Sequence, residues 1–600
     1  MEVSHWTTPR VHPQPLAVAG SKSPRSTQLA QSRRGDGNAL RLHSWTGLGD
    51  VLRALAVGYA AAEAGYEVNI DLEQPSCAPL KSVLDISALS PLPLVTQGEE
   101  GNWTDIRAAL WAVPDCMLRA ADYADVGFVS TPRYGMLQKP SGSVWTRLNR
   151  LKLKPPYVLL CMGGHWADDI KALTVAQAEA VAQSCDRVNA ELIVVGAQKT
   201  GDTLPGRDLR GETPIDELCA LVSEALCVVT AETGVAHLAN SLNTPCIVVS
   251  PEKTVPGLPY VCPVGYVTGE TAASVSEERV VAAFERMVTA AQTPWVMGGW
   301  EHNLCGVALV ARRIAAAAGV PCVPFGERDP NTWAVYEYLD DYRLRVPTRR
   351  TILSAHKDGL PNYSQFPAVI WHSAQFLDWH RAECKRAHYI PLPVGEGREE
   401  DAPPAHPRHI MWHGHVHRRK GLPIIVDAFA RLRETIPDAI LTLLAGTGVH
   451  DPGEQAWLDA LYLRIEAGNA PGIVIDQKDF WEPADLHKRL LGADLFVHGE
   501  NEDGEQSAAS AEELPYRRPV VVSQSTRHDE IRGWCATPGG MRNDPGELSR
   551  TLADTMLDPE KYKRLCERAG MGASYRKERL VARQYRAVVT QAVYDEGAER

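Results

Sequence analysis

The sequence predicts an α/β fold built from two tandem units, each of two doubly wound, Rossmann-like domains with a cleft between them. Three observations support this prediction. Short apolar segments with strand character alternate with amphipathic helical segments, which is the pattern of parallel sheets. Glycine-containing loops lie at residues 45–50 and 295–301, where each tandem unit begins. The chain has 600 residues, which is too long for one compact core.

The overall composition limits the classes of function. Hydrophobic residues make up 44% and charged residues 23% of the chain, as in soluble globular proteins. The net charge of −12 argues against a nucleic-acid-binding surface over the whole chain. No apolar run approaches the roughly 18 residues that a membrane span needs. Peripheral contact with the inner face of a membrane stays open. Thirteen cysteines without a Cys-x-x-Cys pair fit reduced thiols, so we expect a cytoplasmic protein.

The first 37 residues differ from the rest of the chain. Over the first 35 residues, five basic residues, with many serines, prolines and glutamines, stand against the single acid Glu2. We interpret residues 1–37 as a disordered basic tail. An organelle transit peptide is the alternative, because such peptides are also basic and rich in serine.

Beyond the tail, the strands and helices follow in a regular order. In the first half we expect strands at 39–43, 66–72, 157–162, 192–196 and 227–230, with helices from 51 onward and over 175–188. The helix at 175–188 places five apolar or thiol side chains on one face: Val175, Ala178, Val181, Cys185 and Val188. In the second half we expect strands at 295–299, 320–325, 409–413, 440–445, 472–475, 495–498 and 520–523. Helices are expected there at 307–318, 422–435, 483–491, 506–514 and 576–594.

Proline and charge cluster at two points and divide these elements into domains. The clusters lie at 150–156 and 392–408. They predict domains at 38–150, 151–291, 292–395 and 396–575, followed by a C-terminal helix at 576–600.

Three short segments of the first half are candidates for one ligand cleft. The loop Gly47-Leu-Gly-Asp50 follows the first strand, at the edge where open α/β sheets bind ligands. Glu232 and Thr233 follow the strand at 227–230, and Gly234 opens a helix that would favour an anion at its start. Lys171 would add a positive charge against a phosphate. Each piece also has a simpler interpretation: a turn with an N-cap, a solvated lysine, and a packed histidine at 237.

Together these segments resemble glycosyltransferase family 9, the heptosyltransferases, over about residues 40–290. The family's opening motif is present as Gly49-Asp50-Val51, and its Asp-Thr-Gly-x-x-His signature as Glu232-Thr233-Gly234-Val-Ala-His237. The resemblance implies that Asp50 is the general base of an inverting transfer. It also implies that Lys171, Thr233, Gly234 and His237 hold the donor diphosphate. Glu232 stands where the family has aspartate, next to the donor sugar or nucleotide.

The second half has a basic segment between a predicted strand and a predicted helix, His413-Gly-His-Val-His-Arg-Arg-Lys420. Alternation along the strand would place His413, His415 and His417 on one face, which permits a metal-site interpretation. No carboxylate or cysteine partner can be identified from the sequence. We therefore prefer a phosphate site formed by Arg418, Arg419 and Lys420. A solvated basic loop is the alternative.

An acidic segment, Glu500–Leu514, follows the strand at 495–498 and leads through Gly504 into a helix of small residues. With the basic segment it resembles glycosyltransferase family 4, over about residues 295–595. The resemblance implies a retaining, metal-independent transfer. Lys420 and Arg418 would neutralise the departing diphosphate, and Glu505 would lie by the transferred sugar. Glu512 or Glu513 would bind ribose, since the spacing leaves both open. His415 replaces the family's arginine.

These resemblances imply a cytoplasmic glycosyltransferase with two GT-B-type modules whose acceptor-side domains are shortened. We expect nucleotide-sugar donors, no cofactor, no metal and no nucleic-acid partner. The acceptor would be a glycan, lipid-linked molecule or protein in the assembly of lipopolysaccharide, capsule or glycoprotein. Two alternatives stay open. One module is active and the other is a degenerate docking module, or the protein is a nucleotide-sugar epimerase or hydrolase on the same fold.

Overall fold

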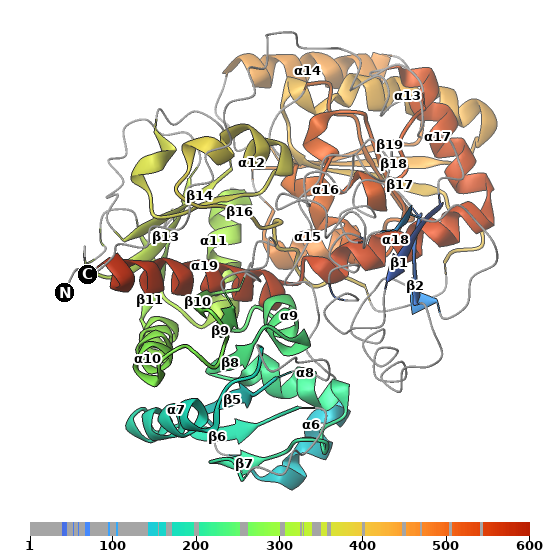
Figure 1. The fold of residues 1–600 in the computed structure, drawn as a ribbon. Helices are drawn as coiled ribbons and strands as arrows, with labels where there is room; N and C mark the ends of the chain where they lie inside the picture. The colour runs from blue at the N-terminus through green and yellow to red at the C-terminus, as the bar shows by residue number, and fades with distance from the viewer. Residues whose placement is uncertain are drawn as a thin grey trace, which may run out of the picture.

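The computed structural model describes most of the chain from residue 142 onward and a few short segments before it. The described residues are 39–44, 52, 58, 67–72, 94–95, 104–105, 142–153, 155–163, 171–196, 203–251, 262–299, 306–324, 327, 329, 331–338, 350–356, 362–398, 403–446, 452–467, 471–479, 481–502, 507–539 and 544–599. Their strands form four parallel sheets with helices packed against them (Figure 1). This arrangement confirms the predicted α/β class of Rossmann-like domains. None of the helices in these ranges is long and apolar enough to cross a membrane.

The first sheet has the strand order β3-β2-β1-β4. Its strands are β1 (Ala39–Ser44), β2 (Glu67–Leu72), β3 (Leu94–Val95) and β4 (Thr104–Asp105). Both predicted strands of this region, 39–43 and 66–72, are confirmed to within one residue. Ala39 of β1 pairs with Glu67 of β2 in parallel register. The basic tail and most of the predicted helix from residue 51 lie outside the described residues.

The second sheet has the order β10-β9-β8-β5-β6-β7. Its strands are β5 (Tyr157–Cys161), β6 (Glu191–Val194), β7 (Arg207–Asp208), β8 (Cys227–Ala231), β9 (Cys246–Pro251) and β10 (Val264–Gly269). Its helices are α6 (Gly142–Leu148), α7 (Val175–Arg187), α8 (Ile215–Glu224), α9 (Gly234–Ser241) and α10 (Glu277–Gln292). The central strands β5, β8 and β9 are buried throughout, because helices cover both faces of the sheet.

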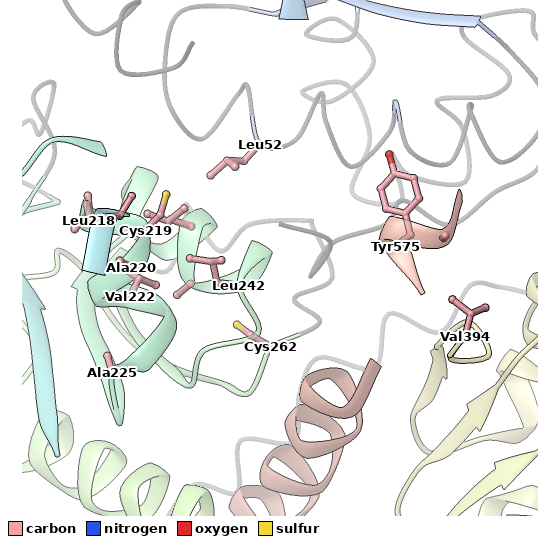
Figure 2. Packing of buried hydrophobic residues seen from close by; sticks show 14 of the residues in the cluster. Leu52, Leu218, Cys219, Ala220, Val222, Ala225, Leu242, Cys262, Val394 and Tyr575 are labelled. Atoms are coloured by element: carbon pink, nitrogen blue, oxygen red, sulfur yellow. The ribbon is translucent and has the colours of Figure 1, made fainter. Parts of the chain in front are cut away.

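Local signals fix the helices of this domain. Thr174 begins α7 with a capping box, in which its hydroxyl accepts from the Gln177 amide while the Gln177 side chain accepts from the Thr174 amide. The predicted face of α7 is confirmed at its centre, where Ala178, Val181 and Cys185 are buried. Figure 2 shows side chains of α8, among them Leu218 and Val222, in the largest hydrophobic cluster.

The third sheet has the order β12-β11-β13-β14-β15-β16. Its strands are β11 (Trp295–Gly299), β12 (Cys322–Pro324), β13 (Trp333–Tyr338), β14 (Thr351–Ala355), β15 (Val369–Trp371) and β16 (Ala387–Tyr389). The helices of this region are α11 (Gly306–Ala318) and α12 (Ala374–His380). The strands from β13 to β16 were not among the predicted elements. They are short, and buried polar residues such as Glu337 and Ser354 interrupt their apolar pattern.

The fourth sheet has the order β19-β18-β17-β20-β21. Its strands are β17 (His409–His415), β18 (Ile440–Gly446), β19 (Ile473–Lys478), β20 (Leu495–His498) and β21 (Val520–Val522). Its helices are α13 (Leu422–Thr435), α14 (Pro452–Ala467), α15 (Pro483–Leu490), α16 (Ala508–Glu512), α17 (Pro545–Leu557) and α18 (Pro559–Tyr575). The helix predicted over 506–514 is wrong in extent. It ends at Glu512 and a 3-10 turn follows over Leu514–Tyr516, since Pro515 disfavours α conformation at the residue before it.

The last helix, α19 (Glu578–Glu599), returns from the fourth sheet to the third. Val394, on the way out of the third-sheet domain, donates its backbone N–H to the carbonyl of Arg576 at 2.8 Å, so the two crossings between these domains lie side by side. Beyond this point α19 packs against α11 of the third-sheet domain and α10 of the second-sheet domain (Figure 1). Figure 2 shows Val394 and Tyr575 at the crossing.

Polar contacts fasten α19 to both neighbouring domains. Gln591 accepts a hydrogen bond from the Val264 amide, and Arg286 donates to the Tyr594 hydroxyl at 2.7 Å. On the other side, Arg350 forms an ion pair with Glu596 at 3.2 Å. The helix therefore connects the second-sheet and third-sheet domains.

Candidate active sites

The first candidate site lies at the carboxyl ends of β5 and β8. Glu232 follows β8 directly, and Thr233 is the N-cap of α9. Lys171 comes from the segment between β5 and α7, and its ammonium nitrogen lies 3.1 Å from Glu232 Oε2. The structure therefore brings together Lys171 and the Glu232–His237 segment, as the sequence predicts. Asp50, the predicted base, lies outside the described residues.

The start of α9 is held by hydroxyl groups from two segments. The Thr233 hydroxyl oxygen accepts from the Val235 amide at 3.2 Å and lies 3.0 Å from the Thr230 hydroxyl. Gly234 is the first residue of the helix, and His237 in its first turn is buried. A helix N-terminus favours negative charge, and Lys171 adds a cation next to it. This arrangement can hold an anionic group such as a phosphate.

The second candidate site lies at the carboxyl ends of β17 and β20. Arg418–Lys420 form a 3-10 turn directly after β17. Gly421 follows with φ of 65°, and a Cβ there would lie 1.7 Å from the carbonyl oxygen of Gly499. Only glycine lets the basic turn approach the loop after β20 so closely. The turn is thereby fixed against that loop.

Lys420 is bound by residues that the sequence analysis did not single out. Its ammonium nitrogen lies 3.0 Å from Glu500 Oε1 and 3.2 Å from the Ser507 hydroxyl. Ser507 itself donates to Glu500 Oε1 at 2.9 Å, and His528 Nε2 lies 2.8 Å from Glu500 Oε2. Burial alone would raise the pKa of Glu500, but His528 and Lys420 outweigh it and hold that pKa well below its usual range. Glu500 is therefore a buried carboxylate anion.

Sequence reasoning missed Glu500, Ser507 and His528 for different reasons. The position of Glu500 could have identified it, because it follows an apolar strand at the edge where open α/β sheets bind ligands. From the sequence it was interpreted only as part of the acidic segment. Ser507 stands among small residues of a helical segment. His528 lies in the separate 3-10 turn Thr526–His528, and nothing in its local sequence places it near Glu500.

The two predicted ribose-binding carboxylates have different surroundings. Glu513 is fully buried, with His413 Nδ1 2.8 Å from its Oε1 and His498 Nε2 2.9 Å from its Oε2. Burial, reinforced by Glu500, raises the pKa of Glu513 well above its usual range. Glu512 is partly exposed and forms an ion pair of 2.7 Å with Arg313 of α11. Glu512 thus reaches toward the third-sheet domain while Glu513 points into the interior.

His415 and Arg418, two further predicted site residues of this half, lie at the carboxyl end of β17 and in the turn after it. His415 ends β17, and burial together with Lys420 lowers its pKa, which favours the neutral imidazole. Arg418 begins the 3-10 turn that ends at Lys420. Gly504 and Glu505 lie outside the described residues.

Two clusters within the described ranges bring histidine and glutamate atoms within 4.8 Å of one another, as a metal ion requires. One consists of His413, His498 and Glu513, and it excludes His415 and His417, which were predicted to share a face with His413. His417 instead caps the 3-10 turn by accepting from the Arg419 amide. A protonated Glu513 can donate to one of its two imidazole neighbours. Among the described residues, both ring nitrogens of His498 and Glu513 Oε2 are buried without a hydrogen-bond partner.

The other cluster joins the ends of three strands in the third-sheet domain: Glu337, His356 and His372. The Ser354 hydroxyl donates to Glu337 Oε2 at 2.8 Å, and Tyr585 of α19 donates to Glu337 Oε1 at 2.9 Å. Burial would raise the pKa of Glu337, but His356 and His372 lower it to about 2. In this cluster, hydrogen bonds account for both carboxylate oxygens of Glu337.

Comparison with known families gives one match. The sequence model of glycosyltransferase family 9 (heptosyltransferase) matches residues 161–256, a range that contains Lys171 and the Glu232–His237 segment. The expected resemblance to this family is confirmed over that range. No curated protein matches the chain.

Several solved structures are similar to parts of the chain at low identity. The E. coli ADP-heptose lps heptosyltransferase II is 14% identical, with 42% of this chain and 98% of that chain covered and a TM-score of 0.31. Anabaena Alr3699/HepE in complex with UDP and glucose is 14% identical, with 74% and 98% covered and a TM-score of 0.33. For the pneumococcal O-GlcNAc transferase GtfA in complex with UDP and GlcNAc, identity is 9% and the TM-score 0.34. In that pair 44% of this chain is covered and 57% of the other, so the match spans little more than half of GtfA. Residues 161–256 are thus a glycosyltransferase family 9-like region within a larger α/β chain.

Proposed function

We propose that this protein is a glycosyltransferase with two GT-B-type modules, which transfers sugars from nucleotide-sugar donors to a growing surface glycan. One observation carries the proposal: within the region that matches family 9, Lys171, Glu232 and the N-terminus of α9 converge at the carboxyl ends of β5 and β8. A cation beside a helix N-terminus, at this edge of a parallel sheet, suits a diphosphate.

In the first module, Lys171 and the start of α9 bind the donor diphosphate. Asp50 removes the proton of the acceptor hydroxyl, and that oxygen attacks the anomeric carbon as the nucleoside diphosphate leaves. The configuration of the sugar is inverted because there is a single displacement. Glu232 fixes the Lys171 ammonium, consistent with their separation of 3.1 Å.

In the second module, Arg418 and Lys420 neutralise the departing diphosphate and no metal ion takes part. Glu505 lies by the transferred sugar, and the transfer retains the configuration. Glu512 is the better candidate for the ribose hydroxyls, because it is partly exposed at the side that faces the third-sheet domain, whereas Glu513 is enclosed. The acceptor is a glycan, lipid-linked molecule or protein on the cytoplasmic side, reached by peripheral membrane contact in the lipid-linked case.

Product analysis of single variants tests the assignment. Purified protein is incubated with UDP-, ADP- and GDP-sugars and glycan acceptors in the presence of a chelator, and the anomeric configuration of each product is read by NMR. We expect Asp50→Ala to abolish the inverted product and Lys420→Ala the retained one, each without affecting the other. Lys563→Ala, at an exposed position on α18, serves as the control. If neither variant changes any transfer, both site assignments are wrong.

A second candidate function is one active transferase module with a docking module. It is favoured by a specific observation in the second module, where Lys420 is already paired with Glu500 and Glu512 with Arg313. In this case Lys420→Ala leaves all nucleotide binding unchanged, whereas Lys171→Ala removes it. An epimerase or hydrolase would differ again, because it would consume the donor with no acceptor present.

A further inference from the structure

The carboxylate of Glu500 lies behind Lys420 and has no role in the transfer chemistry described above. Glu500 is fully buried, as are Ser507, His528 and Ser510 around it, apart from 2% exposure at Ser507. An ionised carboxylate without exposure to water is expensive unless donors surround it. Here Lys420 and Ser507 donate to Oε1, and His528 donates to Oε2. The negative charge of Glu500 therefore holds these three side chains together.

The hydrogen bonds converge on the Glu500 carboxylate, from the core on one side and from the ammonium group on the other. Ser510 Oγ lies 3.2 Å from His528 Nδ1, which fixes the ring that binds Glu500 through its other nitrogen. Glu500 and Ser507 then each take one bond from the ammonium nitrogen of Lys420. Because an ammonium group has three N–H donors, one remains for a phosphate oxygen. Its direction is set by the two bonds already made.

A matching pair occupies the corresponding place in the second sheet. Lys171 follows the strand β5 and precedes α7, as Lys420 follows β17 and precedes α13. Glu232 follows β8, the neighbour of β5, as Glu500 follows β20, the neighbour of β17. The nitrogen–oxygen separations are 3.1 Å and 3.0 Å. Two unrelated local sequences have thus placed a lysine against a carboxylate at the same edge of two sheets.

We propose that Glu500 is a positioning residue for donor binding, which aims the Lys420 ammonium at the diphosphate through the hydrogen-bonded group Ser510, His528, Glu500 and Ser507. The proposal rests on the proposed function, since it assumes that Lys420 binds phosphate. Without the carboxylate, the flexible lysine side chain would sample several rotamers, and each diphosphate bond would require the side chain to be ordered first.

A double-mutant cycle on nucleotide binding tests the proposal. Dissociation constants for UDP, ADP and GDP are measured by calorimetry for the wild type, Glu500→Gln, Lys420→Met and the double variant. If Glu500 acts through Lys420, Glu500→Gln weakens binding about tenfold when Lys420 is present, equivalent to about 1.4 kcal/mol. The same change has an effect of less than about twofold in the Lys420→Met background. Equal losses in both backgrounds would mean a general structural role and overturn the proposal.

Two further variants keep the test decisive. Should Glu500→Gln fail to fold, Ser507→Ala replaces it in the same cycle, because Ser507 bonds both Lys420 and Glu500. Glu547→Gln, which removes a carboxylate that pairs with Arg550 on α17, is the matched control and leaves the affinity unchanged. If the wild type binds a nucleotide and Lys420→Met does not weaken it, the phosphate role of Lys420 fails, and with it the positioning role. If the wild type binds no nucleotide at all, the proposed function itself is wrong.

Discussion

Lys171 is held in place by a carboxylate while it stays partly open to solvent. Its side chain is 31% exposed and that of Glu232 12% exposed. A pair in this setting gains little stability, because water screens it and two side chains must be ordered. Its value is therefore in positioning the ammonium group next to the start of α9. The same residue types packed in the core would have no route to a ligand.

Replacing Lys171 with alanine tests whether its ammonium group serves ligand binding and not stability. A hydrogen bond to a charged phosphate is worth about 1.5–3 kcal/mol, so we expect Lys171→Ala to weaken nucleotide binding to the first site tenfold or more. The unfolding free energy should change by less than about 0.5 kcal/mol. Calorimetric titration and urea denaturation measure the two effects. A large loss of stability with unchanged affinity would make Lys171 structural.

A buried and a half-buried histidine, His413 and His388, predict a dependence of stability on pH. Burial lowers the pKa of His413 to about 3 and of His388 to about 4, from an ordinary value of 6.5. Between these values the unfolded chain binds protons that the folded protein does not, so stability falls as the pH drops below 6.5. Each histidine contributes up to about 1.4 kcal/mol per pH unit.

Urea unfolding at pH 7.5 and pH 5.0 measures this dependence. We expect His388→Gln to flatten the fall in stability, while His406→Gln, at an exposed position, leaves it unchanged. An identical pH slope in the wild type and His388→Gln would show that His388 is protonated in the folded protein.

Among the elements, α9 combines a structural cap with the proposed donor-binding surface. Removing the hydroxyl in Thr233→Ala takes away the acceptor for the Val235 amide and should cost about 1 kcal/mol of unfolding free energy. Thr174→Ala at the start of α7 is the matched control, because Thr174 also caps a helix. We expect similar losses of stability from both variants, but weaker nucleotide binding only from Thr233→Ala. Equal affinities would remove the start of α9 from the donor site.

The helix α19 reaches the polar centre of the third-sheet domain through one hydroxyl group. Tyr585 donates to the fully buried carboxylate of Glu337, at 2.9 Å from Oε1. Tyr585→Phe leaves the carboxylate short of a donor, which should lower the unfolding free energy by about 1–3 kcal/mol.

Tyr462→Phe on α14 is the comparison, because the Tyr462 hydroxyl is buried without a hydrogen-bond partner among the described residues. Its loss should change the unfolding free energy by less than about 0.5 kcal/mol. Chemical denaturation of both variants measures the difference, and equal effects would mean that the bond from Tyr585 to Glu337 contributes nothing.

Helices and strands with regularly spaced apolar residues could be predicted from the sequence. Strands that bury polar residues could not. The strands β5, β8 and β20 and the helices α7 and α13 were predicted to within two residues, since apolar residues dominate their buried faces. The strands β13 and β14 were missed because Glu337, Thr351 and Ser354 form part of their buried pattern, and β15 and β16 because each has only 3 residues.

The residues of the candidate sites also differ in whether the local sequence predicts them. Lys171, Glu232 and Lys420 lie in local motifs, so their positions after strand ends could be predicted. The partners Glu500 and His528 meet only through the tertiary fold, 28 residues apart. The pairing of Glu512 with Arg313 spans 199 residues and two domains, and no local pattern encodes it.

At the scale of the whole molecule, α19 makes the two halves interdependent. It contacts α10 of the second-sheet domain and α11 of the third-sheet domain, and bonds such as Gln591 to the Val264 amide join them directly. The second-sheet and third-sheet domains are therefore fixed next to each other through α19. A fixed separation would give the second site a high effective concentration of the first site's product.

The number of nucleotide sites tests the central claim, that the chain carries two donor-binding modules. Native mass spectrometry and calorimetry of the full chain with UDP, ADP and GDP, in a chelator, would count them. We predict two sites, one lost in Lys171→Ala and the other in Lys420→Ala. One site that depends on only one of these lysines would make the other half a docking module. No bound nucleotide under any condition would contradict the account.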